Sequence, residues 1–199
     1  MGYTTIIDII GSTIIGGFLL LILFRLNASA TENTYNYGSD LNAQQSLTTM
    51  SDVINYDFSK IGYVNGKAPD YDSAIKLADS THFEFYADMN NDGNIDSVSY
   101  LLGPTSDLSN TPNPSDRILY RTVYDTNPPE VTKFTGVSVF RLNYYDASSH
   151  LLSFPISNLE NIARIQILLK TENAEPMNGQ YASAFSQETE YVGYNITER

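Results

Sequence analysis

The chain of 199 residues contains no cysteine and no tryptophan, and only two of its residues are histidines. The absence of cysteine excludes a disulfide framework, a thiolate metal site and a cysteine nucleophile. His82 and His150 are isolated in the sequence, so they do not indicate a catalytic or metal-binding cluster. The sequence also lacks the GxSxG and P-loop motifs. We therefore do not expect an enzyme.

Basic side chains are scarce as well. The chain has 11 lysines and arginines against 23 acidic residues, which gives a net charge of −12. Affinity for nucleic acid comes from basic groups that neutralise phosphates, and anionic membrane surfaces attract the same groups. The composition therefore argues against a nucleic-acid partner and against docking on an anionic membrane surface. The 15 tyrosines, in contrast, suit the half-buried surfaces of β-strands.

A long apolar run lies near the start of the chain, where "IIGSTIIGGFLLLILF" (9–24) carries no charge. With its apolar neighbours it approaches the roughly 20 residues that span a bilayer. Three interpretations compete: a secretory signal peptide, a single-pass anchor, and a membrane helix that also packs against copies of itself. A signal peptide normally has a basic start, which is missing here, although "NASA" (27–30) resembles a cleavage site.

Small residues within the run favour the self-packing helix. Ser12 with Gly16 and Thr13 with Gly17 form small-xxx-small pairs, and Gly11 adds a further small side chain. Such pairs let two helix backbones approach closely in a membrane. We therefore predict that Gly11, Gly16 and Gly17 are close-packing points in assembly.

Asp8 lies inside or at the edge of the apolar run. A carboxylate in hydrocarbon is costly and normally has a partner, so it is a functional hypothesis by default. The expected partner is a positive group on a neighbouring copy, such as its terminal amine. Alternatively, Asp8 lies at the level of the lipid headgroups and only marks the end of the helix.

After the apolar run the chain turns polar, and we expect a weaker stretch or a break in the helix over 27–40. Helical periodicity then resumes, and Gly62 is a plausible C-terminal stop. The apolar residues recur every three or four positions, which predicts one stripe that packs on a sheet. The stripe consists of Leu47, Met50, Ile54, Phe58 and Ile61.

From about residue 80 the apolar period changes to two, which is typical of strands separated by turns rich in Pro and Gly. A long helix followed by consecutive strands predicts an α+β fold, in which a hydrophobic and amphipathic helix packs on an antiparallel sheet. We divide the chain into a membrane or filament-core helix (1–26), a polar break with an amphipathic helix (27–62) and a sheet domain (63–199). The expected strands are 82–87, 96–102, 117–124, 136–146, 163–172 and 180–196.

The loop between the first two expected strands is rich in oxygen-bearing side chains. Counted from Asp88, oxygens stand at positions 1, 3, 5, 7 and 9 and glycine stands at position 6, which is the spacing of a calcium-binding loop. Position 12 is Ser99 where an EF-hand has a glutamate, so we expect weak binding of Ca²⁺, typical of extracellular modules. The alternative is a polar turn held by its own Asx hydrogen bonds. The predicted ligands are Asp88, Asn90, Asp92, Asn94 and Asp96.

Several segments together resemble a known family. "LNAQQSLTTMSDVINYDFSKIGY" (41–63) resembles the latter part of the long helix of type IV pilin-like proteins. "FEFYADMNNDGNIDSVSYLLG", followed by "RILYRTV", resembles the hairpin of their minor members. "GVSVFRLNYYDASSHLLSFP" with "NIARIQILLKTE" is similar to later sheet segments of W-type minor pilins and J-type minor pseudopilins.

The resemblance implies a subunit of a helical filament. Such a subunit is held in the inner membrane before assembly. A pilus or type II secretion assembly machinery then extracts it, and it joins copies of itself or other pilins at the cell surface. The apolar helices would form the filament core and the sheet domains would lie outside. The alternative from another class is a membrane-anchored extracytoplasmic binding module, or a minor pseudopilin that does not form the filament body.

The N-terminus departs from the pattern of this family. Its members usually carry a basic leader, a glycine at the cleavage site and a glutamate fifth in the mature chain, within a methylation motif. Here Gly2 precedes "YTTIID" and no basic leader is present. Cleavage between Gly2 and Tyr3 would make Asp8 the sixth residue. Gly2 and Tyr3 are thus the candidate processing site.

Overall fold

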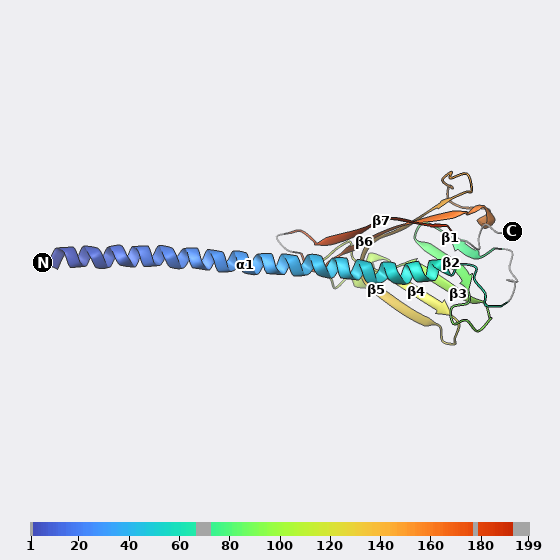
Figure 1. Cartoon of the computed structure of the whole chain (residues 1–199), viewed down its shortest axis with the longest axis horizontal. Helices are drawn as coiled ribbons and strands as arrows, with labels where there is room; N and C mark the ends of the chain where they lie inside the picture. Colours follow the sequence, from blue (N-terminus) through green and yellow to red (C-terminus); the bar gives the residue numbers. More distant parts are fainter. Residues whose placement is uncertain (1, 67–72, 177–178, 193–199) are drawn as a thin grey trace. The chain divides into compact units, whose positions relative to one another are not determined.

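The computed structural model describes residues 2–66, 73–176 and 179–192 of the chain (Figure 1). It contains one long helix, α1, seven strands and two short 3₁₀ helices. The bounds are α1 Gly2–Ser59, β1 Ile75–Ala78, β2 His82–Ala87, β3 Asp96–Leu102, η1 Thr105–Leu108, β4 Arg117–Tyr124, β5 Glu130–Tyr145, η2 Leu159–Asn161, β6 Arg164–Glu172 and β7 Ser183–Val192.

The strands form a single antiparallel sheet in the order β1-β2-β3-β4-β5-β6-β7, so each strand pairs with the next one along the chain. This arrangement of one helix and one antiparallel sheet confirms the predicted α+β fold. The chain divides into two compact units, Met1–Ser39 and Asp40–Arg199. Residues 2–39 of the first unit are helix, and the second unit contains the remaining part of α1 and the sheet.

Helix α1 runs without interruption through 27–40, so the expectation of a break there is wrong. The hydroxyl groups of Thr31 and Thr34 donate to carbonyls four residues earlier, each at 2.9 Å. These side chains therefore satisfy their polar groups within the helix instead of competing with it. Gly38 alone costs only about 1 kcal/mol relative to alanine, which is too little to end a long helix.

The helix ends at Ser59, and Gly62 follows with a φ of 76°, as the sequence predicts for a glycine stop. This left-handed conformation is accessible to glycine without the steric cost of a side chain. The amide of Gly62 then donates to the carbonyl of Tyr86 at 2.8 Å. The turn after the helix is therefore attached to the end of β2.

The strands β2, β3 and β4 have the predicted bounds, whereas β5 begins six residues before the expected start at 136 and β1 is missing from the prediction. A register shift between Val137 and Val139 and a φ of 78° at Gly136 interrupt the alternation of side chains in β5, which hid its first half. Strand β1 has only four residues, too few for a periodic signal. The predicted continuation of the last strand over 193–196 lies outside the described residues.

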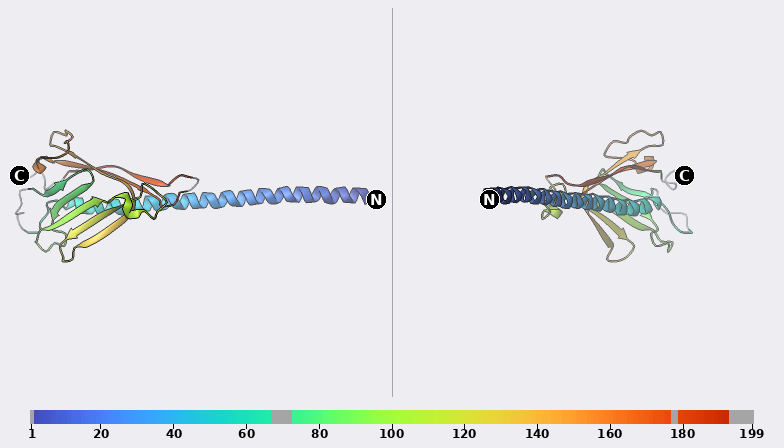
Figure 2. Two further views of the ribbon diagram at one scale, coloured as in Figure 1. Left: turned by 180° about the vertical axis from the view of Figure 1, so that it is seen from behind. Right: turned by 60° about the vertical axis from the view of Figure 1, so that its left-hand side comes forward.

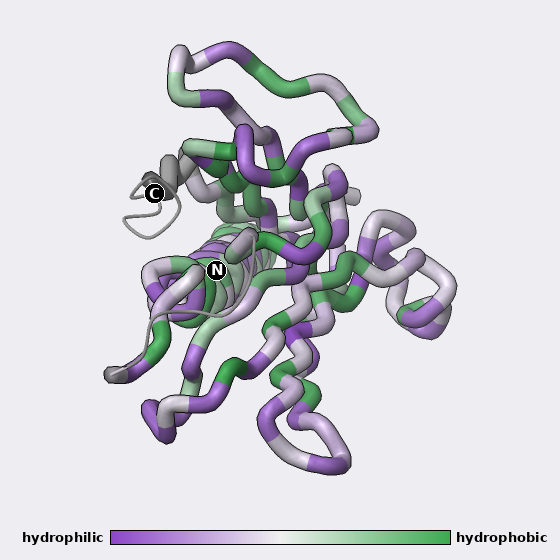
Figure 3. The backbone as a smooth tube through the Cα atoms, turned by 90° about the vertical axis from the view of Figure 1, so that its right-hand side faces the viewer, coloured by the Kyte–Doolittle hydropathy of each residue, from purple (hydrophilic) through white to green (hydrophobic). Residues whose placement is uncertain are grey.

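The sheet curls around the part of α1 that belongs to the second unit (Figures 1 and 2). Hydrophobic and hydrophilic residues are interspersed along the strands (Figure 3). Buried and partly buried residues alternate along β2, so one face of this strand meets the core. The predicted stripe is confirmed, because Met50, Ile54, Phe58 and Ile61 are at most 3% exposed and Leu47 packs beside them. The ring of Phe58 stacks on that of Phe83 with centroids 5.1 Å apart.

A buried ion pair joins the helix to the sheet within this core. The Asp57 side chain is fully buried and accepts hydrogen bonds from Arg121 Nε at 2.5 Å, Arg121 Nη2 at 3.0 Å and Tyr100 Oη at 2.6 Å. Tyr100 and Arg121 are direct cross-strand partners on β3 and β4. One carboxylate on the helix therefore holds two adjacent strands.

The surroundings fix the protonation of both strand partners. Burial by itself lowers the pKa of Arg121, but the hydrogen bonds and charge of Asp57 outweigh it, so this pKa lies above the usual range. Burial and the neighbouring charge of Asp57 raise the pKa of Tyr100 well above its usual value. Tyr100 thus remains a donor, and Arg121 remains a cation.

We predict that Arg121→Met destabilises the full chain by about 3–5 kcal/mol, because it leaves the Asp57 carboxylate buried without its counter-ion. The triple variant Asp57→Leu, Tyr100→Phe, Arg121→Met should lose far less, since no buried charge remains. Chemical unfolding in detergent, followed by circular dichroism, measures both. A triple variant less stable than Arg121→Met would contradict the prediction.

Candidate functional site

The apolar stretch of α1 lies outside the core of the described structure. Every Ile, Leu and Phe side chain from Ile6 to Leu26 is more than half exposed. None of the apolar window is buried, and by length and composition the helix could cross a membrane. A signal sequence near the N-terminus passes the same test. A contiguous exposed apolar surface of this kind normally marks a site of membrane or protein contact.

The predicted assembly residues all lie on this stretch. Asp8, Gly11 and Ser12 share one side of the helix, because residues three and four apart are neighbours on its surface. A Cβ atom added at Gly11, Gly16 or Gly17 would meet nothing within 4 Å. Within the part of the chain that the structure describes, packing therefore does not require glycine at these positions. Their role in close packing stays a prediction about a second copy.

The hydroxyl groups in this stretch are satisfied by the helix itself. Ser12 Oγ and Thr13 Oγ1 both donate to the carbonyl of Ile9, at 2.9 and 2.7 Å. A hydroxyl bonded in this way carries no unsatisfied donor into an apolar environment. Both residues are therefore compatible with hydrocarbon or with the surface of another apolar helix.

The candidate processing site lies at the first turn of α1. Gly2 is its first residue and accepts a hydrogen bond from Thr5 Oγ1 at 3.0 Å, while Tyr3 is 86% exposed. Cleavage between Gly2 and Tyr3 stays a prediction.

The oxygen-rich loop is organised around Asp88, whose side chain is fully buried. Asp88 Oδ2 accepts hydrogen bonds from the amides of Gly93 at 2.8 Å and Asn65 at 3.2 Å, and Oδ1 accepts one from Asp92 at 3.1 Å. Gly93 has a φ of 80°, so it supplies the predicted sharp bend. The carboxylate of Asp88 thus draws the loop backbone around itself.

Further side chains close the loop in the same manner. Asn90 Oδ1 accepts from the amide of Asp92 at 2.9 Å, and Asp92 Oδ1 accepts from the amide of Asn94 at 2.7 Å. Asp96 Oδ2 accepts from the amide of Met89 at 2.9 Å. The bonds accepted by Asn90 and Asp92 each reach the amide two residues on, and they are the Asx hydrogen bonds of the polar-turn interpretation.

Two residues that the sequence did not single out attach the loop to the end of the helix. Lys60 Nζ donates to the carbonyl of Met89 at 2.9 Å, and Asn65 Nδ2 donates to that of Asn91 at 3.0 Å. The amide of Asp88 also donates to the carbonyl of Tyr63 at 2.8 Å. These contacts join segments far apart in the chain, so no local pattern revealed them.

The acidic residues of the loop differ in their electrostatics. Burial by itself raises the pKa of Asp88, but the amides that donate to it outweigh this effect, so its pKa lies below the usual value. Burial also raises the pKa of Asp96, and the nearby charges of Asp125, Asp92 and Asp88 raise it further. The loop therefore holds one strongly stabilised carboxylate beside one that resists ionisation.

The side chains of the predicted ligands are chemically suited to Ca²⁺, which prefers carboxylate and amide oxygens. In residues 2–66, 73–176 and 179–192, however, no three His, Cys, Asp or Glu side chains gather as a group that could hold a metal ion. Several of the predicted ligand oxygens instead accept backbone amides. Calcium binding by the loop stays a prediction.

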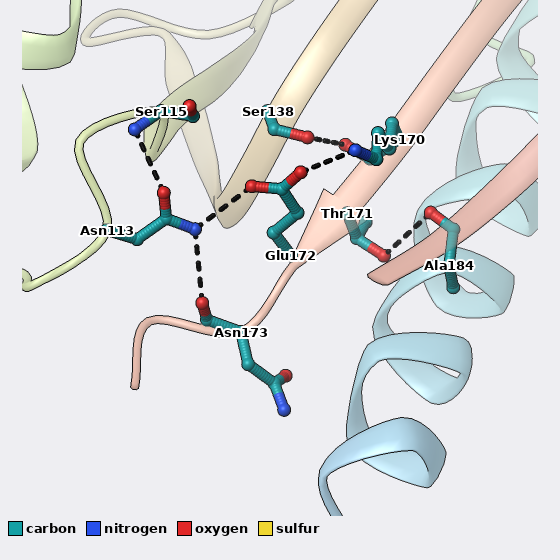
Figure 4. Close-up of polar contacts among 8 residues, drawn as sticks. All are labelled: Asn113, Ser115, Ser138, Lys170, Thr171, Glu172, Asn173 and Ala184. Carbon is teal, nitrogen blue, oxygen red and sulfur yellow. Dashed lines mark hydrogen bonds and ion pairs between the residues drawn. The ribbon is translucent and has the colours of Figure 1, made fainter. Parts of the chain in front are cut away.

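Another polar cluster ties the loop before β4 to the end of β6 (Figure 4). The nearly buried Asn113 donates through Nδ2 to Glu172 Oε2 and to the carbonyl of Asn173, both at 3.1 Å. Burial by itself raises the pKa of Glu172, but Lys170 and Asn113 outweigh it and place this pKa below the usual value. The partners satisfy one another, as expected for a structural contact.

A third cluster, on the strands β2 and β3, contains a serine, a histidine and a glutamate. His82 Nε2 lies 3.2 Å from Ser99 Oγ and 3.2 Å from Glu84 Oε1. A catalytic relay needs the serine and the carboxylate on different ring nitrogens. Because both contacts fall on Nε2, this cluster does not have that geometry.

We predict that Asp88→Asn destabilises the full chain at pH 7, because an amide cannot accept at both oxygens. The folded-state pKa of Asp88 is lowered, so its contribution is present above the unfolded value of about 4 and is lost as the pH falls through the folded pKa. Thermal unfolding at pH 7 and pH 3 measures the difference from the native chain, which should shrink at pH 3. Asp52→Asn, exposed on α1, is the control and should change neither value. An equal loss at both pH values would contradict the assignment.

The chain matches no protein-family model, and no curated protein matches it either. Inferences about function therefore rest on the chain's own sequence, including the resemblance described above, and on its geometry.

Proposed function

We propose that this chain is a structural subunit of an extracellular type IV pilus-like filament. The observation that supports this most is the division of one uninterrupted 58-residue helix between two environments. Its first part exposes an apolar surface, and its last part is the core of a sheet domain. The resemblance of the sequence to type IV pilin-like proteins agrees with this division.

In this proposal the apolar part of α1 holds the subunit in the inner membrane before assembly. Extraction by the assembly machinery then brings the apolar helices of many copies, or of other pilins, together in a filament core. Gly11, Gly16 and Gly17 let neighbouring helices approach closely, and Asp8 pairs with a positive group on the next copy. The sheet domains face outward at the cell surface.

The second candidate is a membrane-anchored extracytoplasmic binding module or a minor pseudopilin. The outer face of the sheet favours this candidate, because a row of aromatic, apolar and basic side chains crosses four strands there. His82, Leu101, Tyr120 and Lys133 are successive cross-strand partners in this row. Here the apolar helix serves only as an anchor.

Asp8→Ala separates the two candidates. If copies assemble through Asp8, this variant should reduce the yield of filaments sheared from cells by about tenfold or more, which corresponds to the loss of about 1.4 kcal/mol per contact. Immunogold electron microscopy of the sheared material measures the yield and shows whether label follows the shaft.

Asp40→Ala is the matched control, because it removes an exposed acidic side chain of the same helix outside the apolar run. It should leave the yield unchanged. Full filament yield with Asp8→Ala, or label of the native chain confined to membranes, would contradict assembly through Asp8 and favour the anchored module.

We also propose that the loop 88–96 binds Ca²⁺ weakly and stiffens the β2–β3 hairpin. Burial is the main cause of the raised pKa of Asp96, and the charges of Asp92 and Asp88 raise it further. This repulsion among the carboxylates of the loop supports a role for a cation there. Asp88 is hydrogen-bonded to Tyr63 and Asn65 in the turn after α1. A cation bound in the loop would therefore also stabilise this turn.

Titration of the full chain with Ca²⁺ in detergent tests this second proposal. A dissociation constant toward the millimolar range is expected, with a stabilisation of about 1.4 kcal/mol at tenfold excess over that constant. Asp92→Asn should weaken binding, and Asp52→Asn should not. Absence of both heat and a thermal shift would rule out the calcium site and leave the Asx turn.

A further inference from the structure

The apolar stripe of α1 does not by itself fix the position of the helix along its own axis. Its members recur every three or four residues, and one helical turn advances about 5.4 Å. A shift of one turn places Met50 where Ile54 packs, and Ile54 where Phe58 packs. Apolar side chains of the stripe therefore still fill two of its core positions, while Phe58 moves to the place of Gly62 and Asp57 to that of Ile61.

The hydrogen bond at the other end of this helical segment can also form after a shift of one turn. Thr171 Oγ1 donates to the carbonyl of Ala43 at 2.9 Å. Because a helix presents a carbonyl at every residue, a shift of one turn would bring the carbonyl of Ser39 to the same hydroxyl. This contact supports packing without selecting one axial position.

Asp57 differs from these contacts because it is a charge with directional partners. Arg121 donates to both carboxylate oxygens through Nε and Nη2, a fork that fits only when the carboxylate is aligned with it. After the one-turn shift, Val53 would face the guanidinium. Arg121 would then be a largely buried cation without its counter-ion.

We propose that Asp57, Tyr100 and Arg121 form a register lock that fixes the axial position of residues 40–59 on the sheet. The lock stands on the geometry of the second unit alone. Its consequence rests on the proposed function: subunits with one helix register would all present their sheet domains at the same height along a filament.

Oxidative trapping tests the lock, because the chain contains no cysteine that would compete. Thr171→Cys is combined with Ala43→Cys to report the observed register, or with Ser39→Cys to report the register shifted by one turn. The full chain in detergent is oxidised, and the rates of disulfide formation are compared. With the lock intact, the Ala43→Cys pair should form at least about tenfold faster than the Ser39→Cys pair.

Two variants then change the lock. In Asp57→Leu, Tyr100→Phe, Arg121→Met no buried charge selects a register, so the ratio of the two rates should fall by at least about threefold. In Val53→Asp, Asp57→Leu the carboxylate is moved by one turn, and the Ser39→Cys pair should become the faster one. The loss of the Thr171 hydroxyl is common to all samples and cancels.

A triple variant in which the ratio of the two rates is unchanged would overturn the lock, because packing and the contacts that follow Ser59 would then set the register. If the triple variant does not fold, as judged by circular dichroism, Arg121→Lys replaces it, since lysine keeps the charge and loses the fork. A lower ratio of the two rates in Arg121→Lys supports the lock, and an unchanged ratio overturns it. Filament assembly is not measured, so failure here is distinct from failure of the filament proposal.

Discussion

A carboxylate inside a hydrophobic core needs partners, and the arrangement around Asp57 follows from that requirement. Arg121 supplies a forked pair of donors and Tyr100 a third donor, from neighbouring strands that face the helix. The ion pair adds little net stability compared with an apolar core of the same shape. Removal of only one partner is costly, because the other charge is then buried without a counter-ion. Its effect is to favour one axial position of the helix on the strands over positions shifted by a helical turn.

The remaining core is built from less specific contacts. The Phe58 ring packs among Phe83, Phe85 and Tyr100, and the stripe of α1 fills the concave face of the sheet. At the end of the helix, Gly62 and Lys60 tie the chain to β2 and to the loop that follows it. The loop 88–96 thus belongs to the helix terminus as much as to its hairpin. A change in the loop would therefore affect both the helix terminus and the β2–β3 hairpin.

The same helix continues into a segment with an entirely different surface. Its apolar side chains are exposed, its hydroxyls are satisfied by the helix itself, and its glycines have open space around them. A soluble domain gains nothing from such a surface, whereas a membrane or a bundle of identical helices would cover it. This contrast within one helix is the physical basis for the proposal of a membrane-held subunit that assembles.

The sequence by itself determined the elements with strong local periodicity: the apolar run, the stripe from Leu47 to Ile61, and the strands β2, β3 and β4. It also placed the bend at Gly93, because glycine and Asx residues act locally. Only the tertiary structure decided that the helix is continuous over 27–40, that β5 starts before its bulge, and that Asp57 meets Arg121. Charges at inward positions of both elements hinted at this last contact, but the pair is separated by 64 residues. Periodicity reports which face is buried, whereas the partner of a buried charge depends on how distant segments come together.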